Sequence, residues 1–165
     1  MLQPMLYLLT AAILTIMFFF MTMSSTMYQS HTSRQEIPEE LSHLSPQQYR
    51  VLYENKTEPE YSSQLVEEDR PGIYVTADTG LIVFDSSHKF GAETGLLGFT
   101  EAVEENVYTR EVSGLFSSQI EVRSRDTSAY LGELLDGGPG QAGQHYSING
   151  SALEFIPDDT AGEAF

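Results

Sequence analysis

The chain has 165 residues, 41% of them hydrophobic, a length that suits one modest globular domain with an appendage. Its 24 acidic residues outnumber 8 lysines and arginines, and the formal charge of -16 argues against a basic surface for nucleic acid. It has 0 cysteines, which excludes a disulfide, a zinc-thiolate site and a thiol nucleophile.

Residues 5–23 form an almost unbroken apolar run. At about 1.5 Å per residue, a helix of this length just crosses a hydrocarbon core of roughly 30 Å. We therefore expect residues 1–23 to be a transmembrane anchor or an uncleaved signal, with the membrane as its partner. A cleaved signal peptide is the alternative, but the basic start and small-residue cleavage site typical of one are not evident here.

The side of the membrane on which the domain lies is predicted from weak signals. Arg34 is the only basic residue near the apolar run and favours a cytoplasmic domain. Because a single N-terminal anchor ahead of a small domain most often exports it, we expect an extracytoplasmic domain. Residues 24–40 are polar and indicate a tether, and residues 158–165 form an acidic C-terminal tail.

A short helix is predicted at the start of the domain, which we place at residues 41–157. Ser45 is a good N-cap, Pro46 suits the first helical position, and Gln48 completes a capping box. Leu44 and Tyr49 are spaced to form a hydrophobic staple across this start.

Short strands follow the helix. Residues 72–76 and 81–84 flank a segment with Asp78 and Gly80 that suits a hairpin turn. Further strands are expected at residues 107–112, 119–124, 130–135, 146–149 and 153–156. Many short strands with glycine-rich turns predict a mainly β fold, a small antiparallel β-barrel-like domain with a helical N-terminal extension.

The stretch 145–155 reads as strand, turn, strand, and together with residues 119–126 and 129–139 it resembles the C-terminal half of the type B methionine sulfoxide reductases. That family reduces the R epimer of methionine sulfoxide. The resemblance extends over residues 44–155, and it implies the same fold for this chain. Other matching motifs are Ser45-Pro46-Gln47-Gln48-Tyr49, Gly72-Ile73-Tyr74, Gly95 with Phe99, Leu131-Gly132 and Asn149.

The resemblance places the family's catalytic positions on residues of different chemistry. The nucleophilic cysteine falls at Ser147, and the two catalytic histidines fall at Tyr130 and Glu133. A resolving cysteine of some members falls at Thr94. The expected substrate-binding positions are Leu96, where the family has a tryptophan, and Phe99, Arg123 and Asn149.

Zinc-binding members of the family carry two Cys-x-x-Cys pairs. These pairs fall at Thr76 and Thr79, and at Ser124 and Thr127, so we expect neither a metal nor another cofactor.

The reductase reaction needs a sulfur nucleophile that accepts the sulfoxide oxygen and is then restored by thiol exchange. Ser147 cannot follow this cycle, so we predict no thiol-dependent reductase activity. A hydrolytic role is also unsupported, because the Gly-x-Ser-x-Gly pattern is absent. His145 lies two residues from Ser147, and the simpler interpretation is a surface or rim histidine.

The retained residues also have structural interpretations. Asn149 suits a cap of the turn into Gly150, and Arg123 suits an ion pair with Glu121. Three hypotheses remain open: a pseudoenzyme that binds methionine or methionine sulfoxide side chains of peptides or proteins, an active reductase, and a structural scaffold. A closed, side-chain-filled pocket would favour the scaffold.

Overall fold

The computed structural model describes residues 37–91, 94–113 and 118–158. The chain divides into two units, Met1–Glu36 and Ile37–Phe165, and every element described below belongs to the second. In the described ranges, no helix is long and apolar enough to cross a membrane. The apolar run at residues 5–23, for which we predict a membrane helix, lies outside these ranges.

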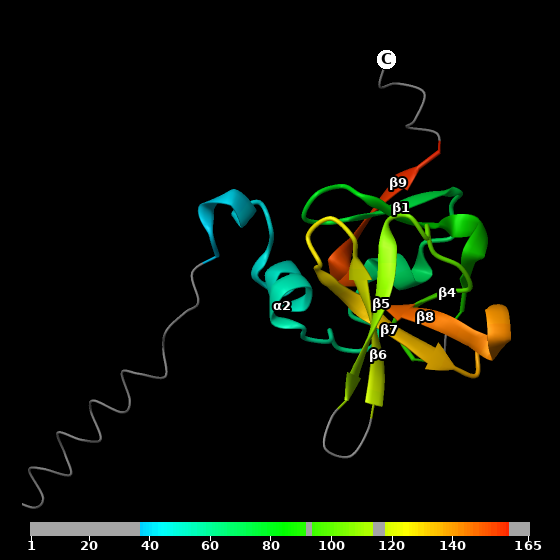
Figure 1. Ribbon diagram of the computed structural model, residues 1–165. Helices are drawn as coiled ribbons and strands as arrows, with labels where there is room; N and C mark the ends of the chain where they lie inside the picture. The colour runs from blue at the N-terminus through cyan, green and yellow to red at the C-terminus, as the bar shows by residue number, and fades with distance from the viewer. Residues whose placement is uncertain (1–36, 92–93, 114–117, 159–165) are drawn as a thin grey trace, which may run out of the picture. The chain divides into compact units, whose positions relative to one another are not determined.

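In the described residues, nine strands form two antiparallel sheets. Figure 1 shows how these strands are arranged. The smaller sheet has the order β2-β1-β9 and contains β1 (Gly72–Thr76), β2 (Ile82–Asp85) and β9 (Leu153–Pro157). The larger has the order β3-β4-β8-β7-β6-β5 and contains β3 (Lys89–Phe90), β4 (Leu97–Phe99), β5 (Val107–Ser113), β6 (Ser118–Ser124), β7 (Tyr130–Asp136) and β8 (Gln144–Ile148).

The mainly β, antiparallel prediction is therefore confirmed, but the described strands lie in two sheets and do not close into one barrel. β8 and β9 follow one another as predicted, yet they belong to different sheets. The 3-10 helix Gly150–Ala152 carries the chain from one sheet to the other. Other 3-10 helices span Glu39–Leu41, Gln64–Glu67, Ser86–His88 and Gln141–Gly143.

The helix α2 (Pro46–Glu54) begins as the sequence predicts. The backbone amide of Gln48 donates to Ser45 Oγ at 3.3 Å, and the Ser45 amide donates to Gln48 Oε1 at 2.8 Å. This reciprocal capping box satisfies two amides that the first turn leaves without helical partners. The helix buries Val51 and Leu52 in the core of the domain.

β3 and β4 were not predicted. Leu97–Phe99 is a buried strand that pairs with both β3 and β8. Three residues are too few to show an alternating pattern, and Gly98 has no side chain to contribute to one. Thr94, Gly95 and Leu96 form the turn before this strand, and Gly95 has a φ of 70°.

Aromatic rings join the two sheets in the core. Phe84 of β2 stacks on Phe99 of β4 with ring centroids 4.4 Å apart, and Tyr74 of β1 meets the same Phe99 ring edge-on at 5.0 Å. All three side chains are fully buried. Because such rings bury large apolar areas, this cluster holds the smaller sheet against β4.

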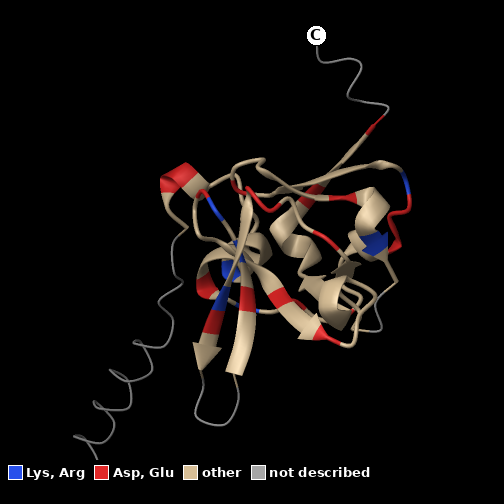
Figure 2. Cartoon of the chain, turned by 45° about the vertical axis from the view of Figure 1, so that its right-hand side comes forward, with Lys and Arg blue, Asp and Glu red and all other residues tan. Residues whose placement is uncertain are grey.

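Figure 2 shows acidic residues along many strands and loops of the domain and far fewer basic ones. This distribution agrees with the sequence-level charge of -16. Like charges spread over a surface keep a domain soluble and attract cationic partners.

Gly132 allows β7 and β8 to approach closely, and its replacement tests this contact. A Cβ atom at Gly132 would lie 2.1 Å from the carbonyl oxygen of Ser147, so one strand would have to move. We expect Gly132→Ala to lower the free energy of unfolding by about 1 to 3 kcal/mol, measured by urea denaturation. Gly91→Ala is the control, because a Cβ there meets no atom within 4 Å. Equal stability of the two variants would contradict the close approach.

Candidate functional site

A register shift in β7 places Tyr130 and Glu133 on one face of the larger sheet. Residues three apart in a regular strand point to opposite faces. Here Glu133 pairs with Glu121 and Tyr130 pairs with Arg123, with an irregularity between Val122 and Arg123. Since Glu121 and Arg123 are two apart on β6, both of their partners lie on the same face.

Ser147 of β8 extends this row. It pairs with Glu133 of β7 on one side and with Gly98 of β4 on the other. Its side chain is only 3% exposed, and its Oγ lies 3.4 Å from Thr94 Oγ1. The structure therefore brings together the expected catalytic positions Ser147, Tyr130 and Glu133, with Thr94 beside them.

The expected substrate-binding positions Leu96 and Phe99 lie in different parts of the domain. Leu96 is half-buried, and its backbone amide donates at 3.4 Å to Thr94 Oγ1, the hydroxyl that contacts Ser147. Phe99 is instead fully buried in the aromatic core. It pairs with Tyr146, whose side chain points to the opposite face of β8 from Ser147.

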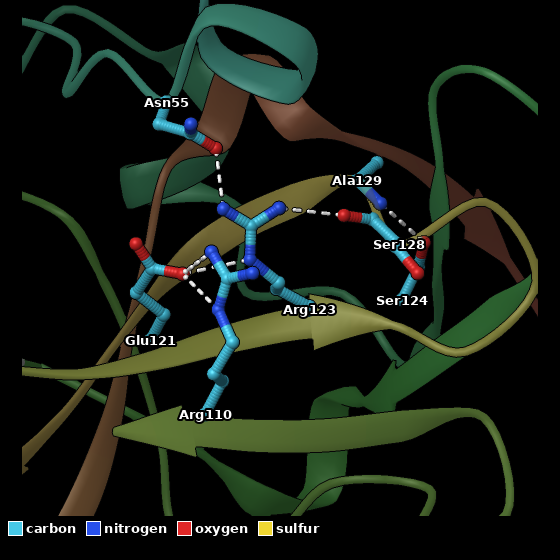
Figure 3. A network of polar contacts seen from close by, with 7 residues as sticks. All are labelled: Asn55, Arg110, Glu121, Arg123, Ser124, Ser128 and Ala129. Carbon is cyan, nitrogen blue, oxygen red and sulfur yellow. Dashed lines mark hydrogen bonds and ion pairs between the residues drawn. The ribbon is translucent and has the colours of Figure 1, made fainter. Parts of the chain in front are cut away.

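Arg123 is the centre of a polar network (Figure 3). Its Nε donates to Glu121 Oε2 at 2.7 Å, its Nη1 to the Ser128 carbonyl at 2.6 Å, and its Nη2 to Asn55 Oδ1 at 2.5 Å. The predicted pair with Glu121 is confirmed. The guanidinium ties the C-terminal end of α2 to β6 and to the turn before β7, and it also lies 5.7 Å from the Tyr130 ring centroid.

Two arginines share the carboxylate of Glu121. Arg110 of β5 donates to Glu121 Oε2 at 2.8 Å, the same oxygen that Arg123 binds (Figure 3). Burial alone would raise the pKa of Glu121, but the hydrogen bonds and charges of the two guanidiniums outweigh it and lower the pKa.

Asn149 is fully buried and does not cap the following turn with its side chain, so that interpretation is wrong. Its Oδ1 accepts from the Glu58 amide at 2.9 Å, and its Nδ2 donates to the Leu131 carbonyl at 2.9 Å. The buried carboxylate of Glu58 accepts from the amides of Gly150 and Ser151 instead. Together they fasten the loop after α2 to the end of β8.

His145 is buried at 8% exposure, which corrects the surface or rim interpretation. Its ring lies 5.4 Å from the Phe90 ring, and its buried Nδ1 has no hydrogen-bond partner in the described part of the chain. Phe90 belongs to β3, a strand that the sequence did not predict. The contact between the Phe90 and His145 rings could therefore not be foreseen.

The four expected zinc positions carry hydroxyl groups that bond to one another in pairs. Thr76 Oγ1 lies 2.9 Å from Thr79 Oγ1, and Ser124 Oγ lies 3.0 Å from Thr127 Oγ1. Thr79 also donates to Asp126, and Thr127 to Asp78. This set does not fit a tetrathiolate zinc site. Over residues 37–91, 94–113 and 118–158, no group of three or more His, Asp or Glu side chains is arranged to hold a metal.

Comparison with known proteins matches residues 44–157 to the SelR domain. One curated relative is the "Peptide methionine sulfoxide reductase MsrA/MsrB" of Vibrio cholerae serotype O1. It is 32% identical over 115 residues, which make up 69% of this chain and 30% of the relative. The chain thus spans less than a third of the length of that protein.

The contact between Thr94 and Ser147 is tested by a disulfide. We expect Thr94→Cys/Ser147→Cys to oxidise to an internal disulfide, because side-chain oxygens 3.4 Å apart put two sulfurs within reach of their bond length of about 2.05 Å. Thiol titration after mild oxidation measures this. Thr109→Cys/Ser147→Cys is the matched control and should stay reduced, since β5 lies three strands from β8. Free thiols in both pairs would contradict the geometry.

The lowered pKa of Glu121 predicts that the fold loses stability in acid. A carboxyl whose pKa is lowered by folding stabilises the fold above its unfolded pKa of about 4.3, and this stability is lost as pH falls through the folded pKa. We expect Glu121→Gln to lower the free energy of unfolding by about 1 to 3 kcal/mol at pH 7 and to flatten its decline below about pH 5. Urea denaturation across this range measures both. Glu111→Gln, at an exposed site on β5, should match the unmodified chain.

Proposed function

Since the chain belongs to the SelR domain family, the type B methionine sulfoxide reductases, we propose that its domain binds methionine-type side chains of peptides without reducing them. The observation that supports this proposal is Ser147, which stands at the nucleophile position with its hydroxyl 3.4 Å from that of Thr94. The domain is thus proposed to be a pseudoenzyme.

The absence of reduction follows from the chemistry of oxygen. In the reductase cycle a thiolate takes the sulfoxide oxygen to become a sulfenic acid, the thioether leaves, and a second thiol restores the first. The same transfer to Ser147 would form a hydroperoxide, which is a stronger oxidant than the sulfoxide. With 0 cysteines in the chain, no other residue supplies the two electrons.

Tyr130 and Glu133 offer hydrogen bonds that differ from those of the two catalytic histidines expected at these positions from the family resemblance. Burial and the charge of Glu133 raise the pKa of Tyr130 to about 12, so its phenol stays protonated at neutral pH and donates. The phenol can therefore hold a ligand oxygen by a hydrogen bond, and the carboxyl group of Glu133 lies on the same face of the sheet.

Leu96 supports the binding of a thioether. It is half-buried beside Thr94, and an aliphatic side chain there offers apolar contact to a methionine methyl group. Asn149 and Arg123 contribute indirectly, because their polar groups are already bonded to Glu58, Leu131, Glu121, Ser128 and Asn55.

Two alternatives each have one observation in their favour. An active peptide-methionine (R)-S-oxide reductase is favoured by the 32% identity to a reductase, although the sulfur chemistry is missing. A structural or interaction scaffold is favoured by the burial of Ser147 at 3% and Tyr130 at 4% exposure, which leaves little open surface.

The location is part of the proposal and depends on the sequence alone. The apolar residues 5–23 would anchor the chain in a membrane, and residues 24–40 would tether the domain on the extracytoplasmic side. A methionine-containing peptide or protein is the proposed partner there.

Binding is tested by nuclear magnetic resonance on the ¹⁵N-labelled 165-residue chain, titrated with N-acetyl-methionine methylamide and with its R-sulfoxide. We expect amide shifts to cluster at Ser147, Glu133 and Leu96. Leu96→Ala should weaken binding by about 10-fold, because apolar contact worth roughly 1.4 kcal/mol is lost.

Ile82→Ala is the control, because this exposed side chain lies on β2 of the other sheet. It should leave the affinity unchanged. No shifts with either ligand would reject the binding proposal and favour the scaffold.

A further inference from the structure

A cavity of about 530 Å³ lies beside the larger sheet, away from Ser147. Leu134 of β7 and Tyr146 of β8 line it and are direct cross-strand partners. Leu134 directly follows Glu133 of the candidate site, and Tyr146 directly precedes Ser147. Successive side chains of a strand point to opposite faces. The cavity is therefore separate from the row that contains Ser147 and Glu133.

The wall formed by residues 100–105 is held in place by its backbone. The Thr100 amide donates to the His88 carbonyl at 2.9 Å, and the Val103 amide donates to the Val83 carbonyl at 3.0 Å. Arg125 Nη2 donates to the Glu104 carbonyl at 3.2 Å. A wall bonded at three points has a fixed backbone, as ligand sites that are largely preformed do.

Three glutamates, all of them exposed, are among the residues that line this cavity, Glu101, Glu104 and Glu105, and no lysine or arginine is among its lining residues. Glu101 Oε2 lies 3.8 Å from His88 Nε2. The other two have no ion pair within the described ranges, because Arg125 bonds only backbone carbonyls there. Burial, and then the charges of Glu104 and Glu101, raise the pKa of Tyr146, which agrees with their closeness to its ring.

The lining selects the class of ligand. The carboxylates favour a cation, and Leu134 and the Tyr146 ring favour apolar and cation–π contact with it. A bare metal ion fits poorly, since no three His, Asp or Glu side chains among the described residues are grouped to hold one. The volume is in the range of about 300 to 1,000 Å³ that small ligands occupy.

We propose that this cavity binds an alkylguanidinium, the chemistry of an arginine side chain, with the cation at Glu104 and Glu105 and the stem on Leu134 and Tyr146. A planar guanidinium forms paired hydrogen bonds with carboxylates and stacks on aromatic rings, so it uses both features of the lining. The net charge of -16 attracts such a ligand. This site is independent of the proposed methionine-binding function.

The test is a titration of the ¹⁵N-labelled 165-residue chain at low salt with N-acetyl-arginine methylamide, and with the citrulline analogue as a neutral isostere. We expect shifts at Leu134, Gln144 and Tyr146, none at Ser147, and at least about 10-fold weaker binding of the citrulline analogue. Agmatine is the second arm: tighter binding than the peptide-like probe indicates a free guanidinium metabolite, and weaker binding indicates a peptide.

Glu104→Gln/Glu105→Gln should weaken the binding of the arginine probe by about 10-fold or more. The control Glu39→Gln/Glu40→Gln removes the same charge at the exposed 3-10 helix before α2 and should retain the affinity at equal ionic strength. Equal binding of the arginine and citrulline probes, equal loss in both double variants, or an absence of shifts at the cavity would each overturn the proposal.

Discussion

The close approach of β7 and β8 is the constraint on which the site depends. Gly132 has no side chain to separate the strands, and a Cβ there would overlap the Ser147 carbonyl. With the strands in contact, Ser147 faces Glu133, and Asn149 reaches the Leu131 carbonyl beyond the end of the ladder. The register shift at the same end of β7 adds Tyr130 to that face. Backbone geometry therefore assembles the site whatever chemistry its side chains carry.

This separation of shape from chemistry explains how the family fold persists without a cysteine. Arg123 and Asn149 are expected from the family resemblance to bind substrate, yet their polar groups bond to Glu121, Asn55, Glu58 and other parts of the domain. Both residues serve the fold directly. The hydroxyl pairs at the expected zinc positions likewise join the turn after β1 to the turn after β6 by hydrogen bonds, through Asp126 and Asp78.

Local signals in the sequence predicted the local structure. The capping box of α2 and the hairpin of β1 and β2 depend on residues within a few positions of one another, so both were foreseen. The bond between Glu58 and Gly150 spans 92 positions, and no spacing rule indicates it. β4 was too short to show a pattern, and without it neither the core position of Phe99 nor the neighbours of Ser147 could be derived. The family resemblance supplied the site positions that residue patterns could not.

The most direct test of a binding domain without reductase chemistry is a turnover measurement. The 165-residue chain would be incubated with N-acetyl-methionine-R-sulfoxide and dithiothreitol, and the methionine product followed over time against dithiothreitol alone. We expect no product above that background, because Ser147 cannot accept the sulfoxide oxygen reversibly. Product formation that exceeds the background and scales with protein concentration would contradict it.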